Sequence, residues 1–356
     1  MNINIKISIV GLLFLVLILF SNCIDEIKLN IDTNQRSVAI EGLIGDELAA
    51  YAIKLNFSAV IGVGNDNVLD PITGASVLVL DDAGNTFEFV ESMESPGTYE
   101  KEMKGEAGRA YFTEIKLPDG RIIKSTPTVL LKAPAIDSVH ARVVEEGKVS
   151  GNGNNVIVTS KVEIEVSTEF STEEKPFLRW RADGEYEFLE DYPDAISPRT
   201  CYIKNNVDLN KLKIFDTRTL EGNRISKEPF LTTTLDGRFA FNYCFHIFQY
   251  AMNEAEFKYW DAVSDIINID GSLFDPPPGT VRGNLFIEDN PAEVVVGYFS
   301  VSGVSSKRFF ANPQSIGVLF VASSCRRRFN RTLPSECFDC TTIRNSSLIK
   351  PDYWNP

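Results

Sequence analysis

The stretch PITGASVLVLDDAGNTFEFVE, residues 71–91, decides the fold class of this chain. Two runs rich in strand-forming residues, 76–80 and 86–90, lie on either side of residues 81–85. Those middle residues read Asp-Asp-Ala-Gly-Asn, which is the composition of a tight turn between antiparallel strands. The stretch therefore predicts a β-hairpin.

The same pattern continues on both sides of this hairpin. Apolar residues recur at nearly every second position in 37–44 and 51–58, and a Pro-Asp-Gly turn at 118–120 separates two more alternating runs. Short strands with turn signals roughly every ten residues predict a β-sandwich over residues 37–131. This region also resembles immunoglobulin-like and transthyretin-like modules of bacterial surface proteins, a fold that supports many functions and decides none.

Residues 132–356 predict a second β-rich domain. It begins with a linker-like stretch at 131–139 and has alternating runs at 156–168 and 177–190. A run dense in aromatic residues follows at 238–252. Because about 330 residues remain after the N-terminal segment, two domains is the expected number.

One segment of this second domain breaks the strand pattern. In NEAEFKYWDAVSDIINIDG, residues 253–271, Asn253 is placed to cap a helix and Glu256 follows three residues later. The apolar residues after it share one helical face at three- and four-residue spacing: Phe257, Trp260, Val263 and Ile267. The segment predicts one helix over about 253–268.

The N-terminus carries the clearest indication of location. An apolar run at 7–20 is interrupted only by Ser8 and Gly11, and it ends just before Cys23. The run is too short for a membrane-spanning helix, which needs about 20 apolar residues, and is typical of a signal peptide. We expect residues 1–22 to be removed, Cys23 to be acylated, and 23–36 to form a tether. A plain secretory signal is the alternative.

The net charge excludes one class of partner. The chain carries a formal charge of −14, and removal of Lys6 with the signal peptide gives −15. Such an acidic chain is a poor candidate for binding nucleic acid, which requires clustered Lys and Arg. Repulsion from an anionic membrane surface fits a folded body held away from the lipid by a tether. Each buried methylene of an acyl chain contributes about 0.8 kcal/mol to such an anchor.

The cysteines predict disulfides. With Cys23 acylated, the other five permit two disulfides and one remaining thiol in an oxidising compartment: Cys201, Cys244, Cys325, Cys337 and Cys340. The pairing stays open, with a bridge from Cys325 to Cys337 or Cys340 expected first because it closes the shortest loop. The Cys337–Cys340 spacing also suits a zinc half-site or a redox pair, but no fourth ligand lies near it in the sequence.

Four stretches together are similar to one family: VAIEGLIGDE (38–47), GSLFDPPPGTVRGNL (271–285), VVGYFSVSGVSSKR (295–308) and CFDCTTIRNSSLIKPDYW (337–354). The chain resembles a Bacteroidota surface lipoprotein family defined by domain of unknown function 4249. The resemblance implies that Asp25 and Glu26 act as a surface-export signal after the lipidated cysteine. It also implies a partner, since members are typically encoded beside TonB-dependent receptors. It carries over no catalytic residue.

The sequence contains few residues that suggest a catalytic or metal-binding site. The two histidines, His140 and His246, lie in strand-like apolar runs and are expected to be packed or edge residues. Asp66, Asn67 and Asp70 could bind calcium, but they lack the loop spacing and central glycine, so a solvated turn is preferred. We expect no catalytic residues, no metal and no cofactor.

Two surface features are predicted. Asp137-Ser138-Val139 fits the pattern glycosylated on serine in exported Bacteroidota proteins, which makes Ser138 a candidate O-glycosylation site. A rigid proline loop loses little entropy when it docks, so a partner-contact loop is expected at Phe274, Pro276, Pro277 and Pro278.

These observations favour a non-enzymatic lipoprotein, anchored in the outer membrane and facing the cell exterior. It would act as an accessory or substrate-capturing subunit of a TonB-dependent receptor complex. The alternatives are a structural or assembly subunit of another outer-membrane machine and, with less support, a secreted hydrolase on a β-scaffold.

Overall fold

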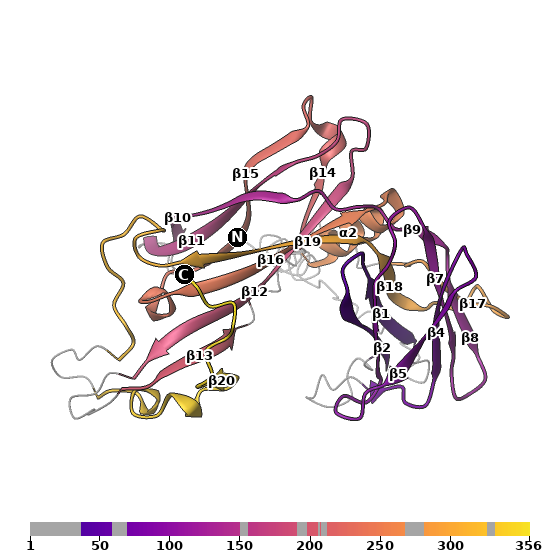
Figure 1. Cartoon of the computed structure of the whole chain (residues 1–356), viewed down its shortest axis with the longest axis horizontal. Coiled ribbons are helices and arrows are strands. Elements are labelled where there is room, and N and C mark those ends of the chain that lie inside the picture. Colours follow the sequence, from indigo (N-terminus) through magenta and orange to yellow (C-terminus); the bar gives the residue numbers. More distant parts are fainter. Residues whose placement is uncertain are drawn as a thin grey trace, which may run out of the picture. The chain divides into compact units, whose positions relative to one another are not determined.

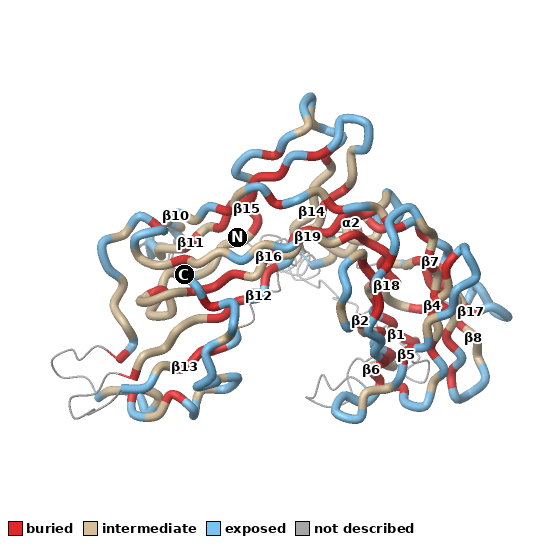
Figure 2. Tube along the Cα trace, viewed as in Figure 1, coloured by how far each residue is buried: buried red, intermediate tan, exposed pale blue. Residues whose placement is uncertain are grey.

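The computed structural model describes residues 37–58, 70–149, 156–190, 198–205, 207, 212–267, 281–325 and 332–356 (Figure 1). Within these residues the chain is mainly β, with one α-helix, as the sequence predicts. Buried and exposed positions alternate along many strands (Figure 2), because successive side chains of a strand point to opposite faces of its sheet.

The predicted hairpin at 71–91 is confirmed. It consists of β4 (Ser76–Asp81) and β5 (Thr86–Glu91), which pair antiparallel from Val77 opposite Phe89. The Asp81 carboxylate closes the turn by accepting hydrogen bonds from the backbone N–H groups of Ala83 and Asn85 at 3.0 and 2.8 Å. Burial acts to raise the pKa of Asp81, but a hydrogen bond from the Asn85 side chain and the two from the backbone outweigh it and lower that pKa.

The hairpin belongs to an eleven-stranded sheet with the path β17-β8-β7-β4-β5-β6-β2-β1-β18. β3 and β9 pair at the side of this path with β2 and β7. Its other strands in chain order are β1 (Val38–Ile44), β2 (Ala49–Phe57), β3 (Asp70–Pro71), β6 (Thr98–Met103), β7 (Ala110–Lys116), β8 (Ile122–Ser125), β9 (Thr128–Val129), β17 (Leu285–Ile287) and β18 (Val296–Val301).

Two strands from late in the chain complete this sheet. β18 pairs parallel with β1, with Ala39 opposite Val296, and β17 pairs antiparallel with β8. Their inward residues join the first hydrophobic core, where Phe299 and Val301 are fully buried beside Ile40 and Ile53. The immunoglobulin-like or transthyretin-like identity of this region and the boundary at residue 131 stay predictions.

The rest of the chain forms two sheets. A three-stranded sheet has the order β10-β11-β15, and a six-stranded sheet has the order β19-β16-β12-β13-β20, with β14 pairing beside β12. Their strands are β10 (Ile136–Val149), β11 (Val156–Glu169), β12 (Phe177–Leu189), β13 (Thr200–Asn205), β14 (Lys213–Asp216), β15 (Arg224–Thr234), β16 (Tyr243–Met252), β19 (Gly303–Ala311) and β20 (Ser346–Ser347). A second core lies between the two sheets and includes Ile164 of β11 and Phe245 of β16.

The predicted helix is α2 (Glu254–Ile267). Asn253 caps it as expected, since its side-chain oxygen accepts a hydrogen bond of 2.8 Å from the backbone N–H of Glu256. The Glu256 side chain is fully buried and accepts hydrogen bonds from Ser302 and Trp260 at 2.7 and 3.3 Å. It therefore joins α2 to the segment between β18 and β19. Short 3₁₀ turns occur at η1 (Thr217–Thr219), η2 (Gly237–Phe239), η3 (Ser335–Cys337) and η4 (Cys340–Thr342).

Candidate functional site

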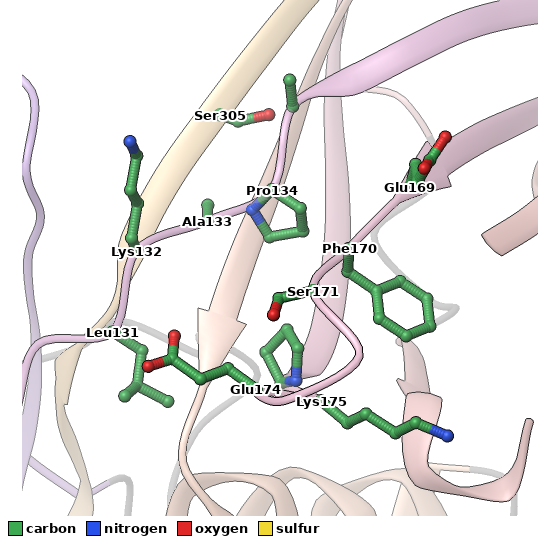
Figure 3. Close-up of a pocket in the computed structure, with 12 residues that line it drawn as sticks. Leu131, Lys132, Ala133, Pro134, Glu169, Phe170, Ser171, Glu174, Lys175 and Ser305 are labelled. Atoms are coloured by element: carbon green, nitrogen blue, oxygen red, sulfur yellow. The ribbon is translucent and has the colours of Figure 1, made fainter. Parts of the chain in front are cut away.

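An open pocket of about 820 Å³ lies between the connection 131–135 and the loop 170–176 (Figure 3). The connection joins β9 to β10, the loop joins β11 to β12, and Ser305 of β19 completes the lining. A volume of this size falls within the range of roughly 300–1,000 Å³ that small-molecule pockets occupy. We take this pocket as the candidate ligand site.

The lining of the pocket combines apolar surface with a few polar groups. Leu131, Pro134 and Phe170 supply apolar contacts, while Glu174 adds a carboxylate. Ser305 adds a hydroxyl whose Oγ is buried and has no hydrogen-bond partner among the described residues. Such a lining can bury an apolar group of a ligand and bind a polar group beside it.

Two lysines that line the pocket, Lys132 and Lys175, extend away from its middle (Figure 3). The ammonium group of Lys175 donates a hydrogen bond of 2.7 Å to the carbonyl oxygen of Leu220. That contact directs the charge of Lys175 to the loop after η1 and away from the pocket.

A buried glutamine fixes one wall of the pocket. Gln249 of β16 is fully buried, and its Nε2 donates to the carbonyl oxygen of Pro134 at 2.7 Å. Its Oε1 accepts hydrogen bonds from the hydroxyl of Thr168 and the indole N–H of Trp180, both at 2.8 Å. Gln249 thus ties the connection to both sheets around the second core.

The same connection lies close against the start of β19. The backbone N–H of Gly303 donates to the carbonyl oxygen of Leu131 at 2.9 Å, and Leu131 forms a parallel bridge with Ser302. A Cβ at position 303 would lie 2.2 Å from that carbonyl oxygen. Only glycine allows this approach, so Gly303 helps to shape the pocket.

None of these pocket residues was predicted from the sequence. Gln249 was detectable in principle, because it is the one amide within the apolar run YCFHIFQYAM, and a buried polar side chain requires partners. Gly303 and Ser305 had no such signal, because their importance depends on a strand and a connection far apart in the sequence.

The predicted disulfides are present. Cys325 bonds to Cys337, which is one of the two short pairings expected, and Cys201 bonds to Cys340 over 139 residues of sequence. Cys244 is the remaining described thiol, and it is 2% exposed. Burial raises the pKa of Cys244 to about 12.

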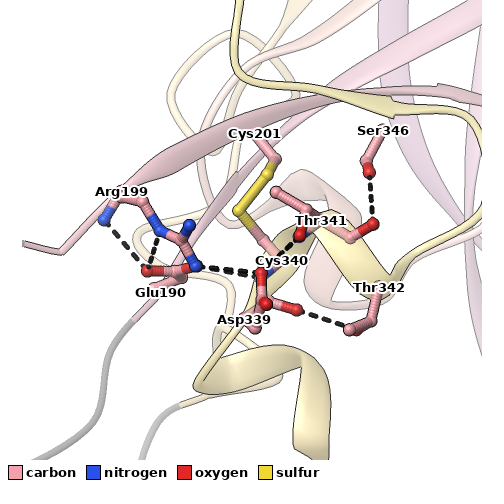
Figure 4. A network of polar contacts seen from close by, with 8 residues as sticks. All are labelled: Glu190, Arg199, Cys201, Asp339, Cys340, Thr341, Thr342 and Ser346. Atoms are coloured by element: carbon pink, nitrogen blue, oxygen red, sulfur yellow. Dashed lines mark hydrogen bonds and ion pairs between the residues drawn. A yellow bond between two sulfur atoms is a disulfide. The ribbon is translucent and has the colours of Figure 1, made fainter.

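A polar network surrounds the longer disulfide (Figure 4). The buried carboxylate of Glu190 accepts hydrogen bonds from the Arg199 guanidinium at 2.7 and 3.1 Å and from the Cys340 backbone N–H at 2.9 Å. Arg199 also donates to Asp339 at 2.9 Å. The hydrogen bonds from Arg199 lower the pKa of Glu190. This network, with the disulfide, fastens the C-terminal segment to β13.

The last residues of the chain cover part of the outer face of β12. Trp354 is 1% exposed, and its indole N–H donates to Glu187 at 2.7 Å. Tyr353 donates its hydroxyl hydrogen to Glu185, and the Arg308 guanidinium lies 4.2 Å from its ring centroid. These contacts are structural, since they use both glutamates of β12, Glu185 and Glu187, to hold the tail.

The two histidines have the packed or edge positions that the sequence predicts. His140 is exposed on β10, where its ring lies 3.2 Å from the hydroxyl of Ser138. His246 on β16 contacts the ring of Phe248, with centroids 4.1 Å apart, and burial lowers the pKa of His246.

Ser138 lies within β10 and is half-buried, whereas the sequence predicted an exposed linker at this position. Glycosylation of Ser138 stays a prediction. Cys23, Asp25, Glu26, Asp66 and Asn67 lie outside the described residues, as does the proline loop with Phe274, Pro276, Pro277 and Pro278.

Across the described ranges, no group of three or more His, Cys, Asp or Glu side chains is arranged to bind a metal ion. Among the helices in the same ranges, none is long and apolar enough to span a membrane.

Comparison with known families supports the resemblance to domain of unknown function 4249. Residues 24–308 match the family described as Domain of unknown function (DUF4249). The chain belongs to this family. The match covers the pocket, α2 and both late strands of the first sheet, but it ends before the C-terminal segment fastened by the disulfides. None of the curated proteins matches the chain.

Proposed function

We propose that the chain is a lipid-anchored accessory or substrate-capturing subunit of a TonB-dependent receptor complex, located on the outer face of a bacterial outer membrane. The observation that carries this proposal is the apolar run at 7–20 that ends shortly before Cys23, with Asp25 and Glu26 just after it. That pattern suits acylation of Cys23, and more than one acyl chain gives a lasting membrane anchor.

The folded body suits a binding role. Its pocket between 131–135 and 170–176 combines apolar surface with the Ser305 hydroxyl, which no described residue pairs, and Gln249 and Gly303 fix its wall. A wall fixed in advance lowers the entropy lost on binding, which favours capture of a ligand. In this role the lipid holds the body at the membrane and the pocket presents cargo to the receptor.

Affinity purification from the native outer membrane after mild detergent extraction tests the proposal. We expect a TonB-dependent receptor to be recovered with the tagged chain, and a tagged unrelated lipoprotein from the same membrane serves as the control. Recovery of the subunits of a different outer-membrane machine would favour the structural or assembly role. Turnover in a panel of hydrolase substrates, lost when one acidic pair is changed, would contradict a pure binding role.

The proline loop provides a narrower test of the receptor contact. Replacing residues 274–278 with a Gly/Ser loop should weaken recovery of the receptor, because a flexible loop loses more entropy when it docks. Unchanged recovery would remove the loop from the proposed contact and leave the lipid-anchored role to be judged by the first experiment.

A further inference from the structure

A second pocket, away from the one in Figure 3, contains an arginine in an unusual setting. Arg179 of β12 lies with its guanidinium carbon 4.6 Å from the ring centroid of Tyr250 and 4.4 Å from that of Trp260. Tyr250 is its neighbour across the β12–β16 pair, and Trp260 comes from α2. Such cation–π contacts attract a guanidinium to the faces of both rings.

The guanidinium of Arg179 has no hydrogen-bond or ion-pair partner within the part of the chain that the structure describes. Its Nε is buried and unpaired. Burial lowers the pKa of Arg179, and the nearby negative charge of Glu256 acts against that shift. The carboxylate of Glu256 itself accepts hydrogen bonds from Ser302 and Trp260.

Arg218 shows what a purely structural stacked arginine looks like in the same protein. Its guanidinium carbon lies 4.1 Å from the ring centroid of Phe177, and the guanidinium also forms an ion pair with Asp216 at 3.0 Å. Arg179 has the stacking without the ion pair. A buried charge without a paired opposite charge destabilises a fold, so this position is poorly explained by packing alone.

Arg179 opens onto a pocket of about 290 Å³. Arg181 and Glu41 also reach the pocket, and its other surfaces include Trp260, Phe230 and Leu231. Rings stacked on a guanidinium cover its faces and leave the N–H donors at its edge available. The pocket therefore offers a planar fork of donors beside aromatic and aliphatic surface.

We propose that this pocket binds a small organic molecule through one carboxylate, which pairs edge-on with the guanidinium of Arg179. A planar carboxylate matches the donor fork of arginine with two parallel hydrogen bonds. Because Glu41 and Glu256 both place negative charge near Arg179, a monoanion suits the pocket better than a phosphate dianion. The role of this pocket as a cargo site rests on the proposed function. Binding of a carboxylate to Arg179 does not, because it can be measured on the isolated chain.

Side-chain NMR of the full-length chain in detergent, with ¹⁵N-labelled arginine, tests the proposal. The Nε–Hε signal of Arg179 is assigned by its loss in Arg179→Lys. We expect N-acetylglycine or glucuronate to shift this signal in a saturable manner, with at least tenfold weaker effects from N-acetylglycinamide and methyl glucoside. Binding of N-acetylglycine would indicate a peptide C-terminus as the ligand, and binding of glucuronate would indicate an acidic sugar.

Matched variants separate binding from stability. Arg179→Lys keeps the charge but loses the planar fork, so affinity for the carboxylate probe should fall at least tenfold, whereas Arg218→Lys should leave it unchanged. Isothermal titration calorimetry measures these affinities, because the Arg179→Lys variant lacks the Nε–Hε signal. Equal shifts from the neutral probes, tighter binding of methyl phosphate, or no shift with either carboxylate would each overturn the proposal. If Arg179→Lys fails to fold, calorimetric titration of the wild type with the charged and the neutral probes still makes the comparison. Receptor recovery is measured separately, so the two proposals fail independently.

Discussion

Gln249 donates a hydrogen bond of 2.7 Å from its Nε2 to the carbonyl oxygen of Pro134. This contact joins the centre of a buried strand to the connection that forms one wall of the pocket in Figure 3. The other end of the same amide accepts from Thr168 and Trp180. The Gln249 side chain thereby holds the wall of the candidate ligand site against the second core.

Gln249→Leu should destabilise the fold, because three polar groups would lose their partner: the buried Thr168 hydroxyl and Trp180 indole N–H, and the half-buried Pro134 carbonyl. Each unpaired buried group costs about 1–3 kcal/mol, so we expect a loss of roughly 3 kcal/mol or more in the free energy of unfolding. Urea unfolding followed by tryptophan fluorescence measures it. The exposed Gln314→Leu is the control and should change stability by less than about 0.5 kcal/mol. Equal midpoints for the two variants would contradict the role given to Gln249.

The network in Figure 4 should make the chain sensitive to acid. Hydrogen bonds from Arg199 lower the pKa of Glu190 in the folded state, so Glu190 contributes stability above its unfolded-state pKa of about 4.3. That contribution is lost as the pH falls through the lowered folded-state pKa. Unfolding measured between pH 7 and pH 3 should show a shallower acid loss in Glu190→Gln than in the wild type. Parallel pH profiles would rule out this contribution.

The two disulfides should contribute unequally to stability. In the loop-closure model, the bridge between Cys201 and Cys340, with a separation of 139 residues, is worth about 5 kcal/mol. The bridge between Cys325 and Cys337, with a separation of 12, is worth about 3 kcal/mol. Replacing each pair by alanine and comparing unfolding midpoints tests the order, and a larger loss from the shorter bridge would contradict it.

Cys244 should be chemically inert in the folded protein. Its pKa of about 12 and its burial keep the thiol protonated and shielded, while alkylating reagents require an accessible thiolate. At pH 8, iodoacetamide should leave Cys244 unmodified in the native chain and modify it fully in urea. Peptide mass spectrometry measures the alkylation of Cys244 under both conditions. Rapid alkylation of the native chain would contradict the prediction and mean that the structure around Cys244 opens readily.

Local features of the fold were predictable from the sequence. The β4–β5 hairpin has its turn chemistry at 81–85, and α2 has its cap at Asn253 and its apolar spacing within one short segment. The parallel pairing of β1 with β18 was not predictable, because it joins segments more than 200 residues apart and no local pattern specifies the partner of a strand.

The candidate sites were less predictable than the fold. The sequence predicted Trp260 on the apolar face of a helix, but the pairing of Trp260 with Arg179 depends on how α2 packs on β12. The first pocket depends likewise on a connection and a loop that meet only in the folded chain. In both cases the chemistry arises from tertiary contacts between ordinary side chains.

Acylation of Cys23 is the condition on which the proposed location and the receptor partnership depend. Mass spectrometry of the N-terminal peptide, taken from the chain purified out of its native membrane, measures it directly. We expect a peptide that begins at Cys23 and carries fatty-acyl chains. An unmodified thiol at position 23, on a chain released free into the medium, would contradict a lipid-anchored role.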